Sequence, residues 1–217
     1  MDVLVVKVTC WRLAHGNKPL WTIRSHPDHI ASLYGIPAVS ESIDTRTLQH
    51  QQPMFHHVNL RLRQCRSGLI SKDVDRHVDE VQLMQSARWV HNLIEREIER
   101  GVSSERIIIA GFSQGGAVSF EAALTYDKPL AGILALSTYF ATANSIKINP
   151  LHNSIPIFIC HGSLDPVVPE SLGRKSLATL QNLGFVPEYN SYPMEHAVSP
   201  QEIENIAAWI SRILGPE

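Results

Sequence analysis

The chain has 217 residues, of which 44% are hydrophobic, and a formal net charge of −2. This length is sufficient for one domain whose core is stable without disulfides or a structural metal. The composition excludes an intrinsically disordered chain, and the small net charge argues against a nucleic-acid-binding protein.

The cysteine content indicates a reducing compartment. Cys10, Cys65 and Cys160 are too few and too widely spaced to form a disulfide framework. The first residues, MDVLVVKVTC, lack the basic region and the long apolar region of a secretory signal peptide. No stretch approaches the ~18 consecutive apolar residues of a membrane-spanning helix. We therefore expect a soluble cytoplasmic protein without an integral membrane segment.

The segment from about residue 17 to residue 71 follows the first short apolar run. It shows neither helical nor alternating periodicity, so we expect it to be irregular, although so long a structureless stretch is unusual in a compact domain. It contains five of the eleven histidines, namely His26, His29, His50, His56 and His57. They form no evident tetrahedral ligand set, and no metal site is predicted.

Regular elements are predicted along the rest of the chain. Apolar residues recur at helical spacing over 76–99, and Gly101 is positioned to end that helix. Short apolar stretches typical of buried strands lie at 107–110, 130–137 and 155–162, with a further strand at 187–192. Helices are predicted at 115–126, 170–183 and 200–214. This alternation predicts a single α/β domain over 1–217, with a mostly parallel sheet and helices on both faces.

The last of these helices has a clear start signal. Ser199 is a suitable N-cap residue, Pro200 suits the first helical position, and Glu202 is placed to complete a capping box. The helix is therefore predicted to begin at residue 200.

A G-x-S-x-G pentapeptide, Gly111 to Gly115, separates the strand at 107–110 from the helix that follows. In this context it predicts a nucleophile elbow, a tight turn that raises the hydroxyl of Ser113 above the sheet. The glycines are needed because side chains there would strike the neighbouring backbone. The backbone N–H of Gln114, in the first helical turn, would face negative charge that develops beside the serine. The alternative is an ordinary glycine-rich turn.

A serine nucleophile needs a base, and the base needs an acid that orients it. Asp165 follows the strand at 155–162, and His196 follows the strand at 187–192, so the chain order is serine, acid, histidine. The alternatives are a turn aspartate before Pro166 and a solvent-exposed loop histidine. Three suitable residues in this order, each after a strand, favour a catalytic triad.

Two other reactive side chains lie close to the acid in sequence. His161 ends the apolar strand before Asp165, and Cys160 lies within it. His161 is a competitor for the role of base, but because it ends an apolar strand and precedes the acid it is interpreted as structural. Cys160 is an alternative nucleophile, but buried cysteines are usually inert packing residues, so it is also interpreted as structural.

Several segments resemble the carboxylesterase/acyl-protein thioesterase family of small α/β-hydrolases. They are AGFSQGGAVS, HGSLDPVVP and MEHAVSP, together with DRHVDE (75–80) and IEREIERGVSSERI (94–107). The resemblance extends over roughly 72–215. It implies hydrolysis of carboxylic esters, with acyl thioesters and lysophospholipids as further candidate substrates, and it implies no metal or cofactor.

The resemblance also implies roles for individual residues. By position, Ser113 is the nucleophile, Asp165 the acid and His196 the base. The backbone N–H of Gln114 is one half of the oxyanion hole.

The N-terminal part departs from the family. His15-Gly16 matches the start of a His-Gly-Leu-Gly motif that completes the oxyanion hole, but the match stops at Asn17. The family's Pro-His-Ala-Pro and Trp-Tyr/Phe-Asp-Ile stretches are missing from the sequence. With suitable codons, both reappear when two nucleotides are skipped within 44–49 and 67–71. We hypothesise that a frame slip follows Gly16 and is undone near Ser71. Sequencing of the gene across codons 16–72 tests this idea, and an unshifted frame there would contradict it.

Two kinds of function therefore follow from the sequence. The first is a serine hydrolase acting on a small acyl ester or thioester. The alternative is a non-catalytic or weakly active remnant, in which the triad is present but the oxyanion loop and the acyl pocket are damaged. Loss of one oxyanion donor lowers the rate about 10²–10³-fold in a serine protease. The sequence indicates neither the acyl chain length nor the oligomeric state.

Overall fold

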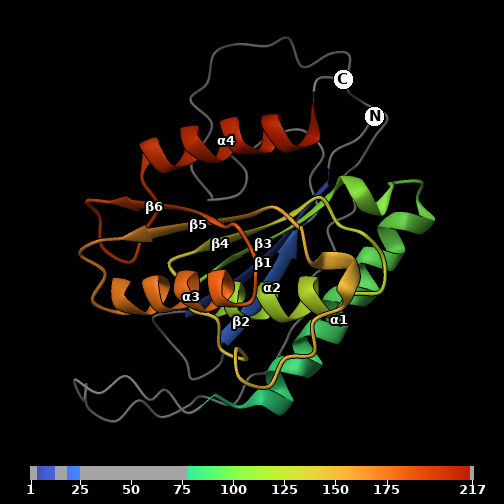
Figure 1. Cartoon of the computed structure of the whole chain (residues 1–217), viewed down its shortest axis with the longest axis horizontal. Coiled ribbons are helices and arrows are strands. Elements are labelled where there is room, and N and C mark those ends of the chain that lie inside the picture. The colour runs from blue at the N-terminus through green and yellow to red at the C-terminus, as the bar shows by residue number, and fades with distance from the viewer. Residues whose placement is uncertain (1–3, 13–18, 25–77, 216–217) are drawn as a thin grey trace.

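The computed structural model describes residues 4–12, 19–24 and 78–215. Their strands form a six-stranded sheet in the order β2-β1-β3-β4-β5-β6, in which β2 runs antiparallel to β1 and the other neighbours are parallel (Figure 1). The strands are β1 (Leu4–Arg12), β2 (Pro19–Arg24), β3 (Ile107–Phe112), β4 (Gly132–Leu136), β5 (Ile157–Gly162) and β6 (Glu188–Tyr192).

Helices cover both faces of this sheet. They are α1 (Glu80–Glu99), α2 (Gln114–Thr125), α3 (Glu170–Asn182) and α4 (Pro200–Leu214). In Figure 1, α1, α2 and α3 lie below the sheet and α4 lies above it. The predicted α/β class, with a mostly parallel sheet and helices on both faces, is confirmed. No helix among the described residues is long and apolar enough to cross a membrane.

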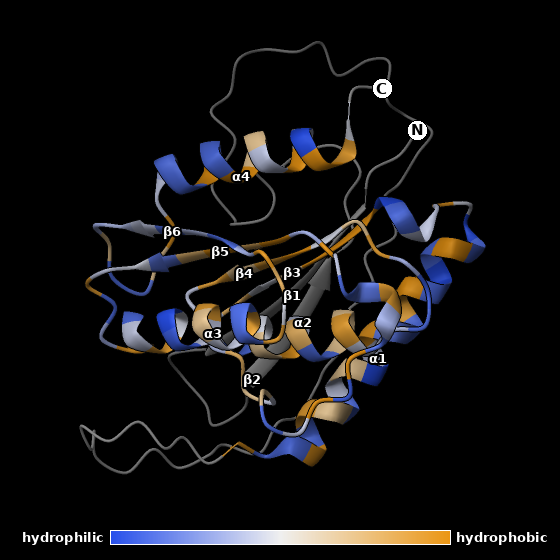
Figure 2. Cartoon of the chain, in the orientation of Figure 1, coloured by the Kyte–Doolittle hydropathy of each residue, from blue (hydrophilic) through white to orange (hydrophobic). Residues whose placement is uncertain are grey.

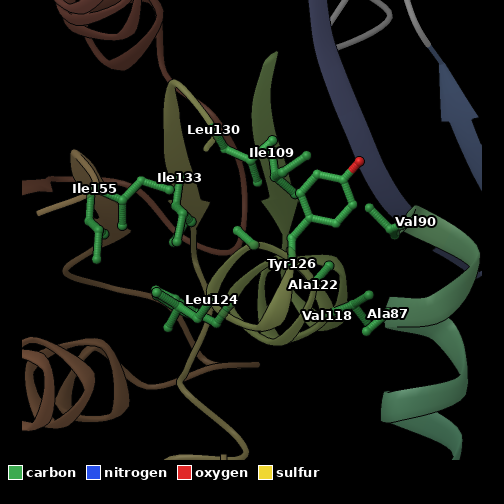
Figure 3. Close-up of a cluster of buried hydrophobic side chains, with 14 of the residues drawn as sticks. Ala87, Val90, Ile109, Val118, Ala122, Leu124, Tyr126, Leu130, Ile133 and Ile155 are labelled. Carbon is green, nitrogen blue, oxygen red and sulfur yellow. The ribbon is translucent and has the colours of Figure 1, made fainter. Parts of the chain in front are cut away.

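The residues of β3 show why this layering is stable. Ile107 and Ile109 belong to the hydrophobic core shared with α1 and α2, whereas Ile108 and Ala110 belong to the core under α4. Figure 3 shows part of the first core, and Figure 2 shows that α4 turns its hydrophilic residues away from the sheet. Successive strand side chains point to opposite faces, so an uninterrupted apolar run fills both cores. Full burial of each isoleucine side chain stabilises the fold by about 1.5–3 kcal/mol.

One part of the sequence prediction is wrong. The segment 17–71 was expected to be irregular, but residues 19–24 form strand β2, paired with β1. Trp21, Thr22 and Ile23 suit a strand, but so short a run shows no clear periodicity by itself. The antiparallel backbone of β1 supplies its hydrogen-bond partners. The other residues of 17–71, together with His15 and Gly16, lie outside the described residues, so the frame-slip hypothesis stays a prediction.

The predicted capping box at the start of α4 is confirmed. The Glu202 N–H donates to Ser199 Oγ at 3.2 Å, and the Ser199 N–H donates to Glu202 Oε2 at 3.3 Å. Glu202 is fully buried, and its Oε1 has no hydrogen-bond partner. Burial raises the pKa of this carboxyl from its ordinary value of 4.5 to about 7.

This shift predicts a pH-dependent stability. Between about pH 4.5 and pH 7 the folded chain keeps the Glu202 proton while the unfolded chain has lost it. The free energy of unfolding should therefore fall as the pH rises through this window, by about 3 kcal/mol in total. Glu202→Gln should remove most of this fall, as measured by urea denaturation at about pH 5 and pH 8.

Glu204→Gln is the matched control, because Glu204 is an exposed carboxylate on the same helix. It should leave the pH dependence of the wild-type chain unchanged. An equal pH dependence in the wild type and in Glu202→Gln would contradict the assignment of the proton to Glu202.

Candidate active site

Ser113 lies in the turn that joins the end of β3 to the start of α2. Its backbone has φ 56° and ψ −126°, a strained conformation for a residue with a side chain. The Ser113 N–H donates to the Leu136 carbonyl at 2.9 Å. The Ser113 carbonyl accepts from the Gly116 N–H at 3.0 Å and from Thr138 Oγ1 at 2.6 Å. The pentapeptide thus forms a strained strand-to-helix turn, as predicted, rather than a relaxed glycine-rich loop.

Two glycines make this turn sterically possible. A Cβ atom at Gly111 would strike the backbone of Gly115 and the side-chain oxygen of Ser119. A Cβ atom at Gly116 would lie 2.6 Å from the Cβ of Thr138. The need for Gly111 was predicted, but the need for Gly116 was not, because its neighbour Thr138 comes from another strand end.

Asp165 and His196 are in direct contact. His196 Nδ1 donates to Asp165 Oδ2 at 2.7 Å. Asp165 Oδ1 accepts from the N–H groups of Val167 and Val168, both at 2.8 Å. The carboxylate is buried and held in one orientation, whereas 17% of the His196 side chain is exposed. An imidazole that donates through Nδ1 has its lone pair on Nε2, which suits it to accept a proton.

His196 also lies next to the serine turn. Its ring and that of Phe112, the residue before Ser113, have centroids 4.7 Å apart and planes inclined at 45°. The turn after β3, the loop after β5 and the loop after β6 therefore meet at the carboxyl edge of the sheet, where functional groups of α/β folds gather. Gln114 begins α2 and is exposed, so its N–H belongs to a helical turn that leaves N–H groups without intrahelical partners.

His161 and Cys160 are buried and contribute to packing. His161 Nε2 donates to the Val168 carbonyl at 2.8 Å, and the same nitrogen is 3.8 Å from Asp165 Oδ2. His161 thus supports the loop that holds the acid. Burial raises the pKa of the Cys160 thiol well above its usual range, which keeps it protonated and unreactive. The structural interpretation of both residues agrees with these positions. No set of three metal-ligating side chains gathers in the described ranges.

One residue of this site was not predicted from the sequence. Thr138 follows β4, and its hydroxyl contacts the carbonyl of Ser113. Its position just after a buried strand, at the edge where Ser113, Asp165 and His196 were expected, was a signal that could have identified it.

The sequence is similar to a known family and to curated fungal proteins. The model of the family described as Phospholipase/Carboxylesterase matches residues 69–214. The chain is 37% identical over 153 residues to "Acyl-protein thioesterase 1" of Gibberella zeae. This match covers 67% of this chain and 65% of that protein. It is 35% identical over 144 residues to the protein of the same name from Neurospora crassa, covering 64% and 59%. The chain thus spans less than two thirds of the length of these relatives.

Solved structures show the same fold. The structure of Arabidopsis thaliana SOBER1 has a TM-score of 0.61 and 30% identity, and the match covers 66% of this chain and 70% of that one. Zea mays acyl-protein thioesterase 2 has a TM-score of 0.57 and 25% identity, covering 66% and 69%. The residues that match the family model, 69–214, include Ser113, Asp165 and His196.

Proposed function

Because the chain belongs to the phospholipase/carboxylesterase family, we propose that it is a serine hydrolase that cleaves carboxylic esters or acyl thioesters with a Ser113–His196–Asp165 triad. The observation that supports this most directly is the 2.7 Å hydrogen bond between His196 and the buried carboxylate of Asp165, beside the strained turn of Ser113. Packing alone does not require a strained serine next to an oriented acid–base pair.

Each residue has a distinct role in the proposed reaction. Ser113 Oγ attacks the carbonyl carbon of the substrate while His196 Nε2 accepts the hydroxyl proton. Asp165 holds Nδ1–H and stabilises the imidazolium ion that forms. The Gln114 N–H donates to the oxyanion of the tetrahedral intermediate.

The second half of the reaction releases the acid. The imidazolium proton of His196 passes to the departing alcohol or thiol, and the carbonyl carbon remains bonded to Ser113 Oγ. Water then attacks this acyl-enzyme, with Nε2 accepting the water proton and returning it to Ser113. The products are a carboxylic acid and an alcohol or a thiol, and the enzyme is regenerated.

Acyl thioesters of proteins are the proposed substrates, because the fungal relatives are named acyl-protein thioesterases. The exposure of the site supports a bulky leaving group. Gln114 is exposed, and Ser113 and His196 are half-buried. The loop after β5, which carries Asp165, exposes the side chains of Leu164 and Val167.

The alternative of an inactive remnant is not favoured. A chain without selection for catalysis has no reason to retain the unfavourable backbone of Ser113 together with a buried, oriented Asp165.

The cytoplasmic location stays a proposal that is based on cysteine usage. Cys160 agrees with it, because this residue is a free, buried thiol.

Hydrolysis of a peptide with an S-acylated cysteine tests the proposal. The purified full-length chain should release the free thiol of the peptide, and a fluorophosphonate should label Ser113, as identified by mass spectrometry of tryptic peptides. A lysophospholipid serves as the competing substrate and should have the lower kcat/KM. A folded chain that hydrolyses none of these substrates and resists labelling would refute the assignment as a serine hydrolase.

A further inference from the structure

Thr138 makes a buried contact with the main chain of the proposed nucleophile. The residue is 1% exposed and lies just after β4, the strand next to β3. Its Oγ1 donates to the Ser113 carbonyl at 2.6 Å. The side chain also occupies the space beside Gly116 that a methyl group there would fill. Thr138 therefore packs against the turn and bonds to it.

This contact affects more than the carbonyl itself. The Ser113 C=O and the Gln114 N–H belong to the same planar trans peptide group, in which they point in opposite directions. A bond that fixes the carbonyl oxygen on one side therefore fixes the direction of the N–H on the other. That N–H is the proposed donor to the oxyanion. Donation to the carbonyl also polarises the peptide and strengthens its N–H as a donor.

The backbone N–H and the backbone carbonyl of Ser113 are both bound by residues at the end of β4. Its N–H donates to the carbonyl of Leu136, and its carbonyl accepts from Thr138. Ser137, between these two residues, has φ 43°. Residues with such unfavourable backbones persist only where surrounding contacts hold them. The end of β4 thus holds the two peptide groups that flank Ser113: Leu136 binds the Phe112–Ser113 peptide, and Thr138 binds the Ser113–Gln114 peptide.

We propose that Thr138 is a positioning residue of this site, which orients the Ser113–Gln114 peptide group and aims the Gln114 N–H at the oxyanion of the acyl substrate. The inference rests on the proposed hydrolase function. It assigns to a side chain outside the triad a specific part in stabilising the transition state.

The size of the effect follows from what remains without the hydroxyl. Complete loss of an oxyanion donor costs about 10²–10³ in kcat in a serine protease. Removal of the Thr138 hydroxyl leaves the Gly116 N–H on the carbonyl, so the peptide is loosened rather than lost. We expect a fall in kcat of about 10-fold, with KM nearly unchanged, because the interaction strengthens mainly in the transition state.

Three variants of the full-length chain test the proposal. Thr138→Val keeps the shape and removes the hydroxyl, whereas Thr138→Ser keeps the hydroxyl. Thr125→Val is the matched control, because Thr125 Oγ1 also donates to a backbone carbonyl, that of Glu121, at 2.6 Å, but at the far end of α2. The measurements are kcat and KM with an acyl ester, the melting temperature, and the affinity for a trifluoromethyl ketone, whose adduct with serine bears an oxyanion.

Thr138→Val should lower kcat and the affinity for the trifluoromethyl ketone by about the same factor, and Thr138→Ser should restore most of both. Thr125→Val should change only the melting temperature. Should Thr138→Val fail to fold, Thr138→Ala takes its place in the comparison with Thr138→Ser.

Two results would overturn the inference while the wild type remains active. One is that Thr138→Val has the same kcat as the wild type. The other is that Thr138→Val and Thr138→Ser lose kcat by the same factor. A wild type that neither turns over esters nor reacts with a fluorophosphonate refutes the hydrolase function itself, and the inference falls with it.

Discussion

Ser113→Ala is expected to abolish both ester turnover and fluorophosphonate labelling. Its Oγ is the atom that forms the acyl-enzyme in the proposed reaction, and an alanine side chain has no nucleophilic atom. By analogy with serine proteases, kcat should fall by about 10⁴–10⁶-fold. The melting temperature should change little, because a half-buried hydroxyl is lost while the main-chain bonds to Leu136 and Thr138 remain. Release of p-nitrophenol from short acyl esters measures the turnover.

Ser163→Ala is the control for this experiment. Ser163 lies at the same edge of the sheet, just after β5, and its Oγ donates to the Tyr192 carbonyl at 3.1 Å. Its replacement should retain turnover and labelling. Labelling of a serine other than Ser113, or normal turnover in Ser113→Ala, would show that the nucleophile has been assigned wrongly.

His196→Ala should lower kcat by several powers of ten, because it removes the base that accepts the proton of Ser113 and leaves the buried carboxylate of Asp165 without its partner. The KM should change less than kcat, since general base catalysis acts in the transition state. Steady-state kinetics with an acyl ester measure both constants.

His161→Ala provides the contrast to this variant. It removes a fully buried ring and leaves the Val168 carbonyl without its donor. We expect a loss of stability of roughly 3 kcal/mol from the cavity and the unsatisfied carbonyl, measured by urea denaturation, with turnover retained in the folded fraction. A well-folded His161→Ala without activity, alongside an active His196→Ala, would mean that the base has been chosen wrongly.

The sequence was sufficient where the cause of a structure is local. The apolar run of β3 and the helical spacing of α1 predicted these elements to within a few residues of their observed bounds. The capping box of α4 was also predicted, because Ser199 and Glu202 are only three residues apart and one helical turn determines their contact. The turn at Ser113 was predicted from the pentapeptide, in which a side chain at Gly111 would strike the backbone of Gly115, whereas the need for Gly116 depends on Thr138 of another strand end.

The consequences of burial were not visible in these patterns. Glu202 is a capping residue in the sequence, but only the packing of α4 onto the sheet makes it a fully buried carboxyl with a raised pKa. Strand β2 depends likewise on a neighbour, because its short run forms a strand through pairing with β1.

The G-x-S-x-G motif and the chain order predicted Ser113, Asp165 and His196 as the residues of the candidate site, since each follows a strand whose carboxyl end lies at one edge of a parallel sheet. Their contacts required the tertiary structure. The bond between Asp165 and His196 spans 31 residues and that between Thr138 and Ser113 spans 25. Backbone and side-chain preferences act over about one helical turn, whereas contacts at these separations depend on the order of the strands and on how the loops between them pack.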